Sequence, residues 1–276
     1  MKKFFALMLV GILALSLVAC GTNNAGSGEA VDYAASVNGA KIVAEAGSAG
    51  EELATGDAFF GEATFTPVDS MAKALMEVQA GTADIAIVDY VTSIGSIGEG
   101  TDYANLKVVE GKDFSPEEYG IAFRKGSDIT PAVNAAIAEL MNDGTMDKIG
   151  ADYKLDALLI KDGKASDDAV VEGDLAAIKA KGEMVIGITL FAPMNYHDEN
   201  NELIGFETEF AKAVCEKLGV AAKFVEINWD TKEIELNSKN IDCIWNGMTI
   251  TAERQENMSI SVPYMQNKQV MVYKAQ

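Results

Sequence analysis

The segment KIVAEAGSAGEELA, residues 41–54, has the composition of an anion-binding site. An apolar run over residues 41–46 leads into the glycine turn GSAG (47–50), and a helix-forming run with two glutamates follows. The first N–H groups of a helix have no partner within it and the helix dipole is positive there, so an anion is stabilised. The turn has neither the Lys-Ser/Thr pair of a P-loop nor the G-x-G-x-x-G pattern. A carboxylate therefore fits these amides better than a nucleotide phosphate.

A bound carboxylate needs a cationic partner, and the chain has only two arginines, Arg124 and Arg254, against 20 lysines. The planar guanidinium suits bidentate carboxylate binding in a way that an ammonium does not. Arg254 ends the segment NGMTITAER, five residues after Thr249, at an expected helix start. The residues alone leave open whether Arg254 binds a ligand or is a solvated surface arginine.

Three further side chains lie near the ends of expected strands. Asp89 follows the strand-like run DIAIV, where it could accept a hydrogen bond from an ammonium group or cap a helix that begins at Tyr90. The residues alone favour the cap. Phe191 and Trp229 are aromatic residues near strand ends, and core packing is the default for both.

The usual components of acid–base or nucleophilic catalysis are missing from the sequence. His197 is the single histidine and lies in the polar stretch YHDENNELIG, and no G-x-S-x-G motif occurs. Cys215 and Cys243 fall in helical and strand patterns, so we expect two buried small hydrophobic residues, with a disulfide between them left open. We therefore expect no catalytic residue, no metal and no cofactor.

Composition sets the size of the fold and excludes one class of partner. The chain has 276 residues, 49% of them hydrophobic, which is enough for a large core and two lobes. The formal charge of −20 repels the phosphate backbone, so nucleic acid is not an expected partner.

The N-terminus has the pattern of a bacterial secretory signal. Two lysines precede an apolar run over residues 4–17, which is shorter than the ~20 residues of a membrane span. The following sequence LVACG resembles a lipobox, so we expect a signal peptide over 1–19, lipidation of Cys20 and a flexible tether over 20–30. This places the protein outside the cytoplasm, anchored by lipid to the bacterial cell membrane. The alternative is a signal anchor in which Cys20 is incidental.

Apolar strand-like runs alternate with helical patterns from residue 41 onward, which predicts an α/β fold with mostly parallel sheets. Ligand sites in such sheets lie beyond the carboxyl ends of the strands. The candidate residues follow the ends of strands 41–46 and 83–88 in the first half of the chain and of strands 183–189 and 241–245 in the second half. Two strand ends from each half suit a cleft between two lobes. The predicted strands are 41–46, 62–67, 83–88, 106–109, 119–124, 183–189, 221–227, 241–245, 258–261 and 268–273, and the predicted helices are 50–55, 69–80, 131–142, 144–152, 173–181 and 206–218.

Several of these segments resemble the amino-acid-binding proteins of ABC importers. The segments GEMVIGITLFAPMNYHDENNELIGFETEFAKAVCEKLG and IDCIWNGMTITAERQENMSISVPYMQNKQVMVY resemble the first lobe of that family. KIVAEAGSAGEELA, LMEVQAGTADIAIVDY and EEYGIAFRKGSDITPAVNAAIAELMNDGTMDKIGADY resemble its second half. The resemblance implies a two-lobed α/β fold like that of the type II periplasmic binding proteins, with the ligand cleft between the lobes.

The order of the segments differs from that of the family, because the second half comes first and the first half last. The chain therefore resembles a circular permutant, with new ends after the hinge strand 268–273 and one connection, near 123–127, crossing the hinge. A polar, acidic stretch lies between the halves. The expected parts are the second lobe (31–123), a return segment with helices of the first lobe (124–155), a linker joining the old termini (156–172) and the main part of the first lobe (173–276).

The resemblance also implies roles for individual residues. Arg254 matches the arginine that binds the ligand α-carboxylate, and Asp89 matches the acid that binds the α-ammonium group. The remaining matched positions are Asn246, Gly247 and Thr249 beside the arginine site, Ser48 and Ala49 in the glycine turn, and the aromatic residues Phe191 and Trp229. Ala49 replaces a hydroxyl residue and Phe191 a tyrosine, so Ala49 would contribute only its amide.

These features together predict a monomeric, lipid-anchored solute-binding protein that delivers an L-amino acid to the permease of an ABC importer. No further acid stands among the matched contact positions, which favours a neutral or polar ligand side chain. A sensor domain for a membrane signalling partner and a dehydratase-like enzyme of the same fold are the alternatives.

Overall fold

The structure is a computed structural model that describes residues 32–165 and 170–275. The expected signal peptide (1–19), the lipidation site Cys20 and the tether (20–30) lie outside the described residues. From Asp32 onward the chain forms one compact unit. Within the described ranges, no helix is both long and apolar enough to span a membrane.

The first half of this unit is built around three parallel strands. β1 (Lys41–Glu45) lies between β2 (Thr64–Val68) and β3 (Ile85–Asp89). β1 is buried after its first residue and β3 is buried throughout, as expected for a parallel sheet covered on both faces. The other elements of this half are α1 (Ala49–Gly56), η1 (Ala58–Phe60), α2 (Met71–Ala80), α3 (Tyr90–Ser96) and β4 (Leu106–Val108).

The second half repeats this arrangement. β6 (Glu183–Ile188) lies between β9 (Ala221–Glu226) and β10 (Cys243–Thr249), again in parallel. The helices α4 (Ile129–Asn142) and α5 (Thr145–Asp152) pack against α7 (Phe206–Leu218). The remaining elements are η2 (Asp156–Leu158), α6 (Asp174–Lys181), β7 (Tyr196–His197), β8 (Leu203–Ile204), η3 (Trp229–Thr231), α8 (Lys232–Asn237), α9 (Ala252–Asn257) and β11 (Met258–Ile260).

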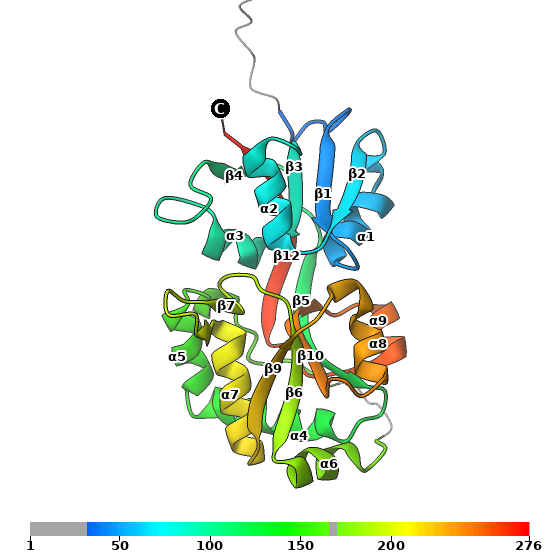
Figure 1. Cartoon of the computed structure of the whole chain (residues 1–276), viewed down its shortest axis with the longest axis vertical. Helices are drawn as coiled ribbons and strands as arrows, with labels where there is room; N and C mark the ends of the chain where they lie inside the picture. The colour runs from blue at the N-terminus through cyan, green and yellow to red at the C-terminus, as the bar shows by residue number, and fades with distance from the viewer. Residues whose placement is uncertain (1–31, 166–169, 276) are drawn as a thin grey trace, which may run out of the picture. The chain divides into compact units, whose positions relative to one another are not determined.

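Two long antiparallel strands, β5 (Pro116–Arg124) and β12 (Met265–Lys274), join the halves (Figure 1). β12 pairs with β5 over 265–268 and with β3 over 269–273, while β5 goes on to pair with β10 and β11. The expectation that the chain crosses once, near 123–127, with strand 268–273 stopping at the boundary, is wrong. Because β12 is one continuous ladder from Met265, the chain crosses on both strands.

The two halves have the same strand order. In the first, β2, β1, β3, β12 and β4 are neighbours in that order, and in the second the order is β9, β6, β10, β5 and β11. In each half the fourth place is taken by the long strand that the other half supplies. The chain therefore forms two similar α/β units, and each unit contributes one long strand to the sheet of the other.

Most predicted elements are present, with ends displaced by a few residues. The short helices α3, α8 and α9 and the β7–β8 pair lack a full amphipathic period, which is why the sequence pattern missed them or marked only their starts. The described residues of the expected linker make contacts with the rest of the second half. Leu159 bridges to Met265, the N–H of Ile160 donates to the carbonyl of Tyr264 at 2.9 Å, and Val171 bridges to Ser127.

The two cysteines are part of the core. Cys215 on α7 and Cys243 on β10 are buried and both are free thiols. The expectation that they pack as small hydrophobic residues is confirmed. Burial raises the pKa of Cys215 to about 12 and raises that of Cys243 well above its ordinary value.

Candidate ligand-binding cleft

The glycine turn lies between β1 and α1, as the sequence predicts. Gly47 has φ +70°, and a Cβ there would lie 3.0 Å from the Cα of Asp230 in the other half, so only glycine fits. Ser48 is the N-cap of α1, and its Oγ accepts from the N–H of Glu51 at 3.2 Å. The next N–H groups, which include that of Ala49, begin the helix and have no partner within it.

Arg254 comes from α9 in the second half and meets the glycine turn of the first. The residue is 5% exposed; its Nη1 donates to the carbonyl of Thr249 at 2.9 Å. Its Nη2 lies 3.3 Å from the carbonyl oxygen of Gly47 and 3.0 Å from Oε1 of Glu52. The structure thus brings the arginine and the turn together across the two halves, and Arg254 is not a solvated surface residue.

Lys232 reinforces the same contact and was not predicted as a site residue. Its Nζ donates to the carbonyls of Gly47 at 2.9 Å and Trp229 at 3.2 Å, and lies 4.9 Å from the centre of the Trp229 ring. Burial lowers the pKa of Lys232 to about 8, with the nearby Arg254 charge acting in the same direction. Trp229 is buried and packs in a core cluster of the second half. A single lysine after Trp229 carries no sequence signal for this role.

Asp89 occupies the N-cap position of α3, but its side chain makes no capping hydrogen bond. The expectation from the residues alone, an ordinary helix cap, is therefore wrong. Its carboxylate accepts from the Tyr119 hydroxyl at 2.7 Å and from the side-chain amides of Asn267 and Gln269 on β12. Burial and, after it, the neighbouring Glu117 carboxylate raise the pKa of Asp89 to about 7. The hinge strands, rather than the α3 backbone, hold this carboxylate.

Gly247 lies against Phe191 and against Tyr119, the residue whose hydroxyl donates to Asp89. Gly247 has φ +55°, and a Cβ there would lie 3.0 Å from Cζ of Phe191 and 3.2 Å from Cζ of Tyr119. The N–H of Gly247 donates to the buried carboxylate of Glu207 at 2.8 Å. Thr249, two residues on, donates through Oγ1 to Glu117 at 3.1 Å. Gly247 therefore permits the close approach of two rings, Phe191 after β6 and Tyr119 on the hinge strand β5.

Asn246 differs from the other predicted site residues because the hydrogen bonds of its side chain are made to residues of its own half. Its Nδ2 donates to Oγ1 of Thr189 at 2.6 Å, and its Oδ1 accepts from the N–H of Thr189 at 2.9 Å and from Asn195. Asn246 thus holds Thr189 in place at the end of β6.

Glu45, the last residue of β1, is a buried acid that the sequence reasoning passed over. It is 1% exposed, and its Oε1 has no hydrogen-bond partner within residues 32–165 and 170–275. Burial and, after it, the nearby Asp89 carboxylate raise the pKa of Glu45 to about 8. A glutamate that directly ends an apolar strand, before a glycine turn, is the signal that could have identified it.

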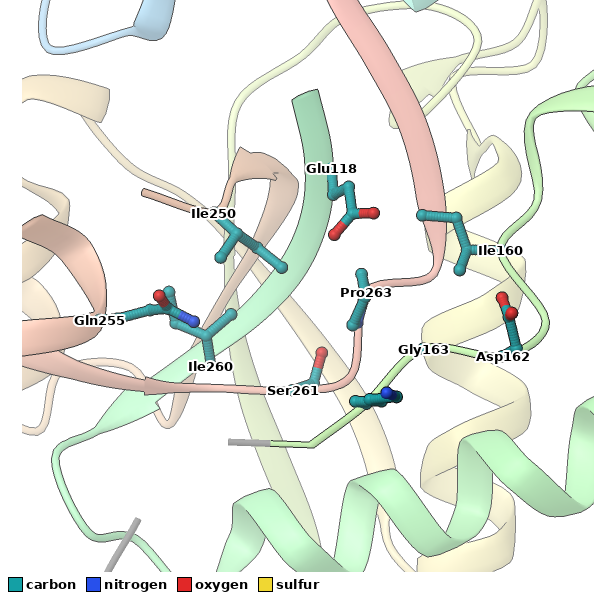
Figure 2. A pocket seen from close by; sticks show the side chains of 10 residues that line it. Glu118, Ile160, Asp162, Gly163, Ile250, Gln255, Ile260, Ser261 and Pro263 are labelled. Carbon is teal, nitrogen blue, oxygen red and sulfur yellow. The ribbon is translucent and has the colours of Figure 1, made fainter. Parts of the chain in front are cut away.

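Hollows open along the hinge within the part of the chain that the structure describes. One, of about 710 Å³, lies between α1, β5 and the end of β10, and both Ala49 and Thr249 line it. The other, of about 310 Å³, also borders Ile250 and is lined by residues 160 and 162–164 of the expected linker (Figure 2). Only the first hollow contains residues predicted for the site.

The two similar α/β halves and the two strands exchanged between them define the class of fold, which is that of the type II periplasmic binding proteins. Residues 184–276 match the model of the bacterial extracellular solute-binding proteins, family 3. Over this segment, the predicted resemblance to amino-acid-binding proteins of ABC importers is confirmed.

Named relatives agree with this class. The chain is 35% identical over 94 residues to the L-cystine-binding protein TcyJ of Escherichia coli (strain K12), covering 34% of this chain and 35% of that protein. It is 34% identical over 112 residues to the L-cystine-binding protein TcyA of Bacillus subtilis (strain 168), covering 40% and 41%. The chain thus spans well under half the length of these relatives. A membrane-bound lytic murein transglycosylase F of Sodalis glossinidius matches at 34% identity over 104 residues, covering 37% of this chain and 22% of that protein.

Among solved structures, a polar amino acid ABC uptake transporter substrate-binding protein from Streptococcus thermophilus is 35% identical. The match covers 30% of this chain and 31% of that one, with a TM-score of 0.29.

Proposed function

We propose that this protein is a solute receptor that captures an L-amino acid between its two halves. The observation that carries the proposal is the meeting of Arg254 with the glycine turn, in which Nη2 lies 3.3 Å from the carbonyl of Gly47. One half thus supplies a guanidinium and the other a helix start, and both groups stabilise a carboxylate.

The remaining groups suit the other parts of an α-amino acid. Asp89 is a buried carboxylate at the end of β3 that binds the α-ammonium group, while Phe191 and Trp229 pack against the ligand. Ser48 and Ala49 contribute at the turn, with Gly247, Thr249 and Asn246 supporting the arginine side. Because each half holds only part of this set, the ligand gains its full binding energy when the halves approach, which shifts the population toward the closed form.

The cellular role that we propose follows from the family and from the N-terminal sequence. The closed form docks on the permease of an ABC importer as a monomer, and a lipid on Cys20 holds the protein at the outer face of the bacterial cell membrane. Cys20→Ala removes the thiol group to which the lipid would be attached. This variant is expected to be released from the membrane without a change in its affinity for the ligand.

We also propose that the chain is circularly permuted, with 31–123 as the family's second lobe, 124–155 and 173–276 as its first lobe, and 156–172 as the linker; the last strand of the first lobe, β12, continues into the sheet of the second. The identical strand order of the halves supports this, because each half already takes a strand from the other. A contact between Tyr33 and Tyr273, with ring centres 5.8 Å apart, also brings the beginning of the first half close to the end of β12.

Isothermal titration of the purified chain against the twenty amino acids tests the receptor proposal. At least one is expected to bind, and Arg254→Ala is expected to weaken it roughly 10- to 150-fold, corresponding to loss of a charge-assisted contact. Lys107→Ala, which removes an exposed charge elsewhere, is the control. Absence of any binding, or an unchanged affinity in Arg254→Ala, would refute the proposal, and turnover of the bound amino acid would indicate an enzyme instead.

A further inference from the structure

Glu45 lies where the two halves face each other, although no role in binding the α-carboxylate or α-ammonium group falls to it. It ends β1, beside Asp89 at the end of β3. Gly47, two residues further on, accepts hydrogen bonds from Lys232 and Arg254 of the opposite half through its carbonyl oxygen. Glu45 is therefore close to the point at which the two halves meet.

The carboxyl group of Glu45 is incompletely satisfied. The side chain is 1% exposed, and its Oε1 has no hydrogen-bond partner among the described residues. A buried carboxylate oxygen without a donor is costly, and native proteins normally pair such a group. An acceptor left open at the carboxyl ends of the strands is a place for a donor that arrives with the ligand.

The neighbouring charged groups are already engaged. Asp89 accepts from Tyr119, Asn267 and Gln269. Arg254 is paired with Glu52 and with the carbonyls of Gly47 and Thr249.

Lys232 attracts Glu45 electrostatically, but its ammonium group donates to the carbonyls of Gly47 and Trp229. Lys232 therefore leaves the open oxygen of Glu45 without a hydrogen bond.

We propose that Glu45 selects the ligand by binding the cationic side chain of a basic L-amino acid. This deepens the proposed function and rests on it, and it replaces the neutral or polar side chain expected from the sequence. A cation suits the site better than a neutral donor, because it offsets a second buried carboxylate beside Asp89 as well as filling the open acceptor. The α-carboxylate and α-ammonium groups keep the partners proposed above.

The test compares ligands and not only affinities. L-arginine, L-lysine, L-glutamine and L-leucine are titrated calorimetrically into the full chain, into Glu45→Gln and into Glu62→Gln, a matched loss of one exposed carboxylate. The full chain is expected to bind at least one basic ligand about tenfold or more tightly than L-glutamine and L-leucine. Glu45→Gln is expected to remove most of this preference, and Glu62→Gln to preserve it.

The outcomes separate this inference from the proposed function. If no amino acid binds the full chain, the proposed function fails. If amino acids bind but the basic ligands are not preferred, the receptor stands and the role of Glu45 is refuted. A uniform loss for all ligands in Glu45→Gln also refutes it, since that would make Glu45 a contact between the halves. A melting curve of each variant verifies folding, and Glu45→Asp, which keeps the charge, is expected to retain part of the preference.

Discussion

The ammonium group of Lys232 lies 2.9 Å from the carbonyl oxygen of Gly47, although the two residues belong to opposite halves. Arg254 donates to the same oxygen at 3.3 Å. One backbone carbonyl in the glycine turn is therefore the point at which two buried cations of the second half meet the first. These contacts form where the ligand carboxylate is proposed to bind, so closure and binding use the same groups.

Lys232→Met should weaken binding without changing selectivity. Methionine keeps an apolar stem against Trp229 but removes the hydrogen bond that spans the halves, which is worth roughly 0.5–3 kcal/mol. We expect the affinities for all bound amino acids to fall by a similar factor in calorimetry. A loss confined to one side-chain class would mean that Lys232 contacts the ligand side chain directly.

Gly247→Ala should destabilise the fold more than Gly219→Ala does. Both glycines have positive φ, but only at Gly247 would a Cβ meet neighbours, the rings of Phe191 and Tyr119, whereas the space around Gly219 is open. The strain of the backbone, about 1 kcal/mol, is common to both, and overpacking adds roughly 1–3 kcal/mol at Gly247. Urea unfolding at one pH measures the difference, and equal losses would show that the rings move aside.

The stability of the ligand-free protein should fall as the pH rises from 5 to 7.5. The folded-state pKa values of Glu45, Asp89 and Glu207 are raised to about 8, 7 and 7, chiefly by burial. Their unfolded values are near 4, so in this range the folded state binds more protons than the unfolded one, and the stabilisation is lost as pH passes through the folded values. Lys232, with a pKa of about 8, stays mostly charged below this value and adds little slope.

Thermal melting in matched buffers at pH 5, 6.25 and 7.5 measures this slope. Asp89→Asn should flatten it by removing one of the three groups, whereas Glu62→Gln, an exposed acid, should leave it unchanged. A melting temperature that rises with pH in this window would contradict the assignment of raised pKa values.

Cys215 and Cys243 should resist thiol reagents in the folded protein. Burial raises both pKa values, to about 12 for Cys215, so little reactive thiolate exists at neutral pH. In a Cys20→Ala variant, the thiol reagent dithiobis(nitrobenzoate) should react slowly under native conditions. In guanidinium chloride it should react with both thiols. Rapid native reaction would show that this core opens readily, and absence of reaction after unfolding would indicate a disulfide.

The sequence carried most of the fold because strong apolar periods mark the long elements. The strands around Ile42, Ile85 and Ile186 are continuous apolar runs, and the glycine turn GSAG predicts where β1 ends. The path of β12 was not predictable in the same way. Whether a strand stops at a boundary or continues across it depends on which neighbour completes its ladder, and a local apolar pattern does not record that neighbour.

The same distinction between local pattern and tertiary neighbour applies to the site residues. Arg254 and the turn at Gly47 could be paired from chemical type, since a guanidinium and a helix start both suit a carboxylate. Lys232 could not, because the chain has 20 lysines and nothing local distinguishes this one. For Asp89 the local rule of a helix cap pointed the wrong way, since three donors from the hinge strands outweigh one backbone N–H. Tertiary partners decided the conformation of each of these side chains.

The proposed permutation predicts that the order of the halves is exchangeable. A chain in which 173–276 precede 32–165, with Gln276 joined to Asp32 by a short glycine–serine linker, should fold with the same strand order. The join is feasible because Tyr33 and Tyr273 are in contact, and each half still receives its long antiparallel strand. We expect ligand affinities within about threefold of the original chain, since loop changes cost little when the ends lie close together. An ordered chain with no binding would show that the present order is needed for closure, and a chain that fails to fold would refute the exchange of equivalent halves.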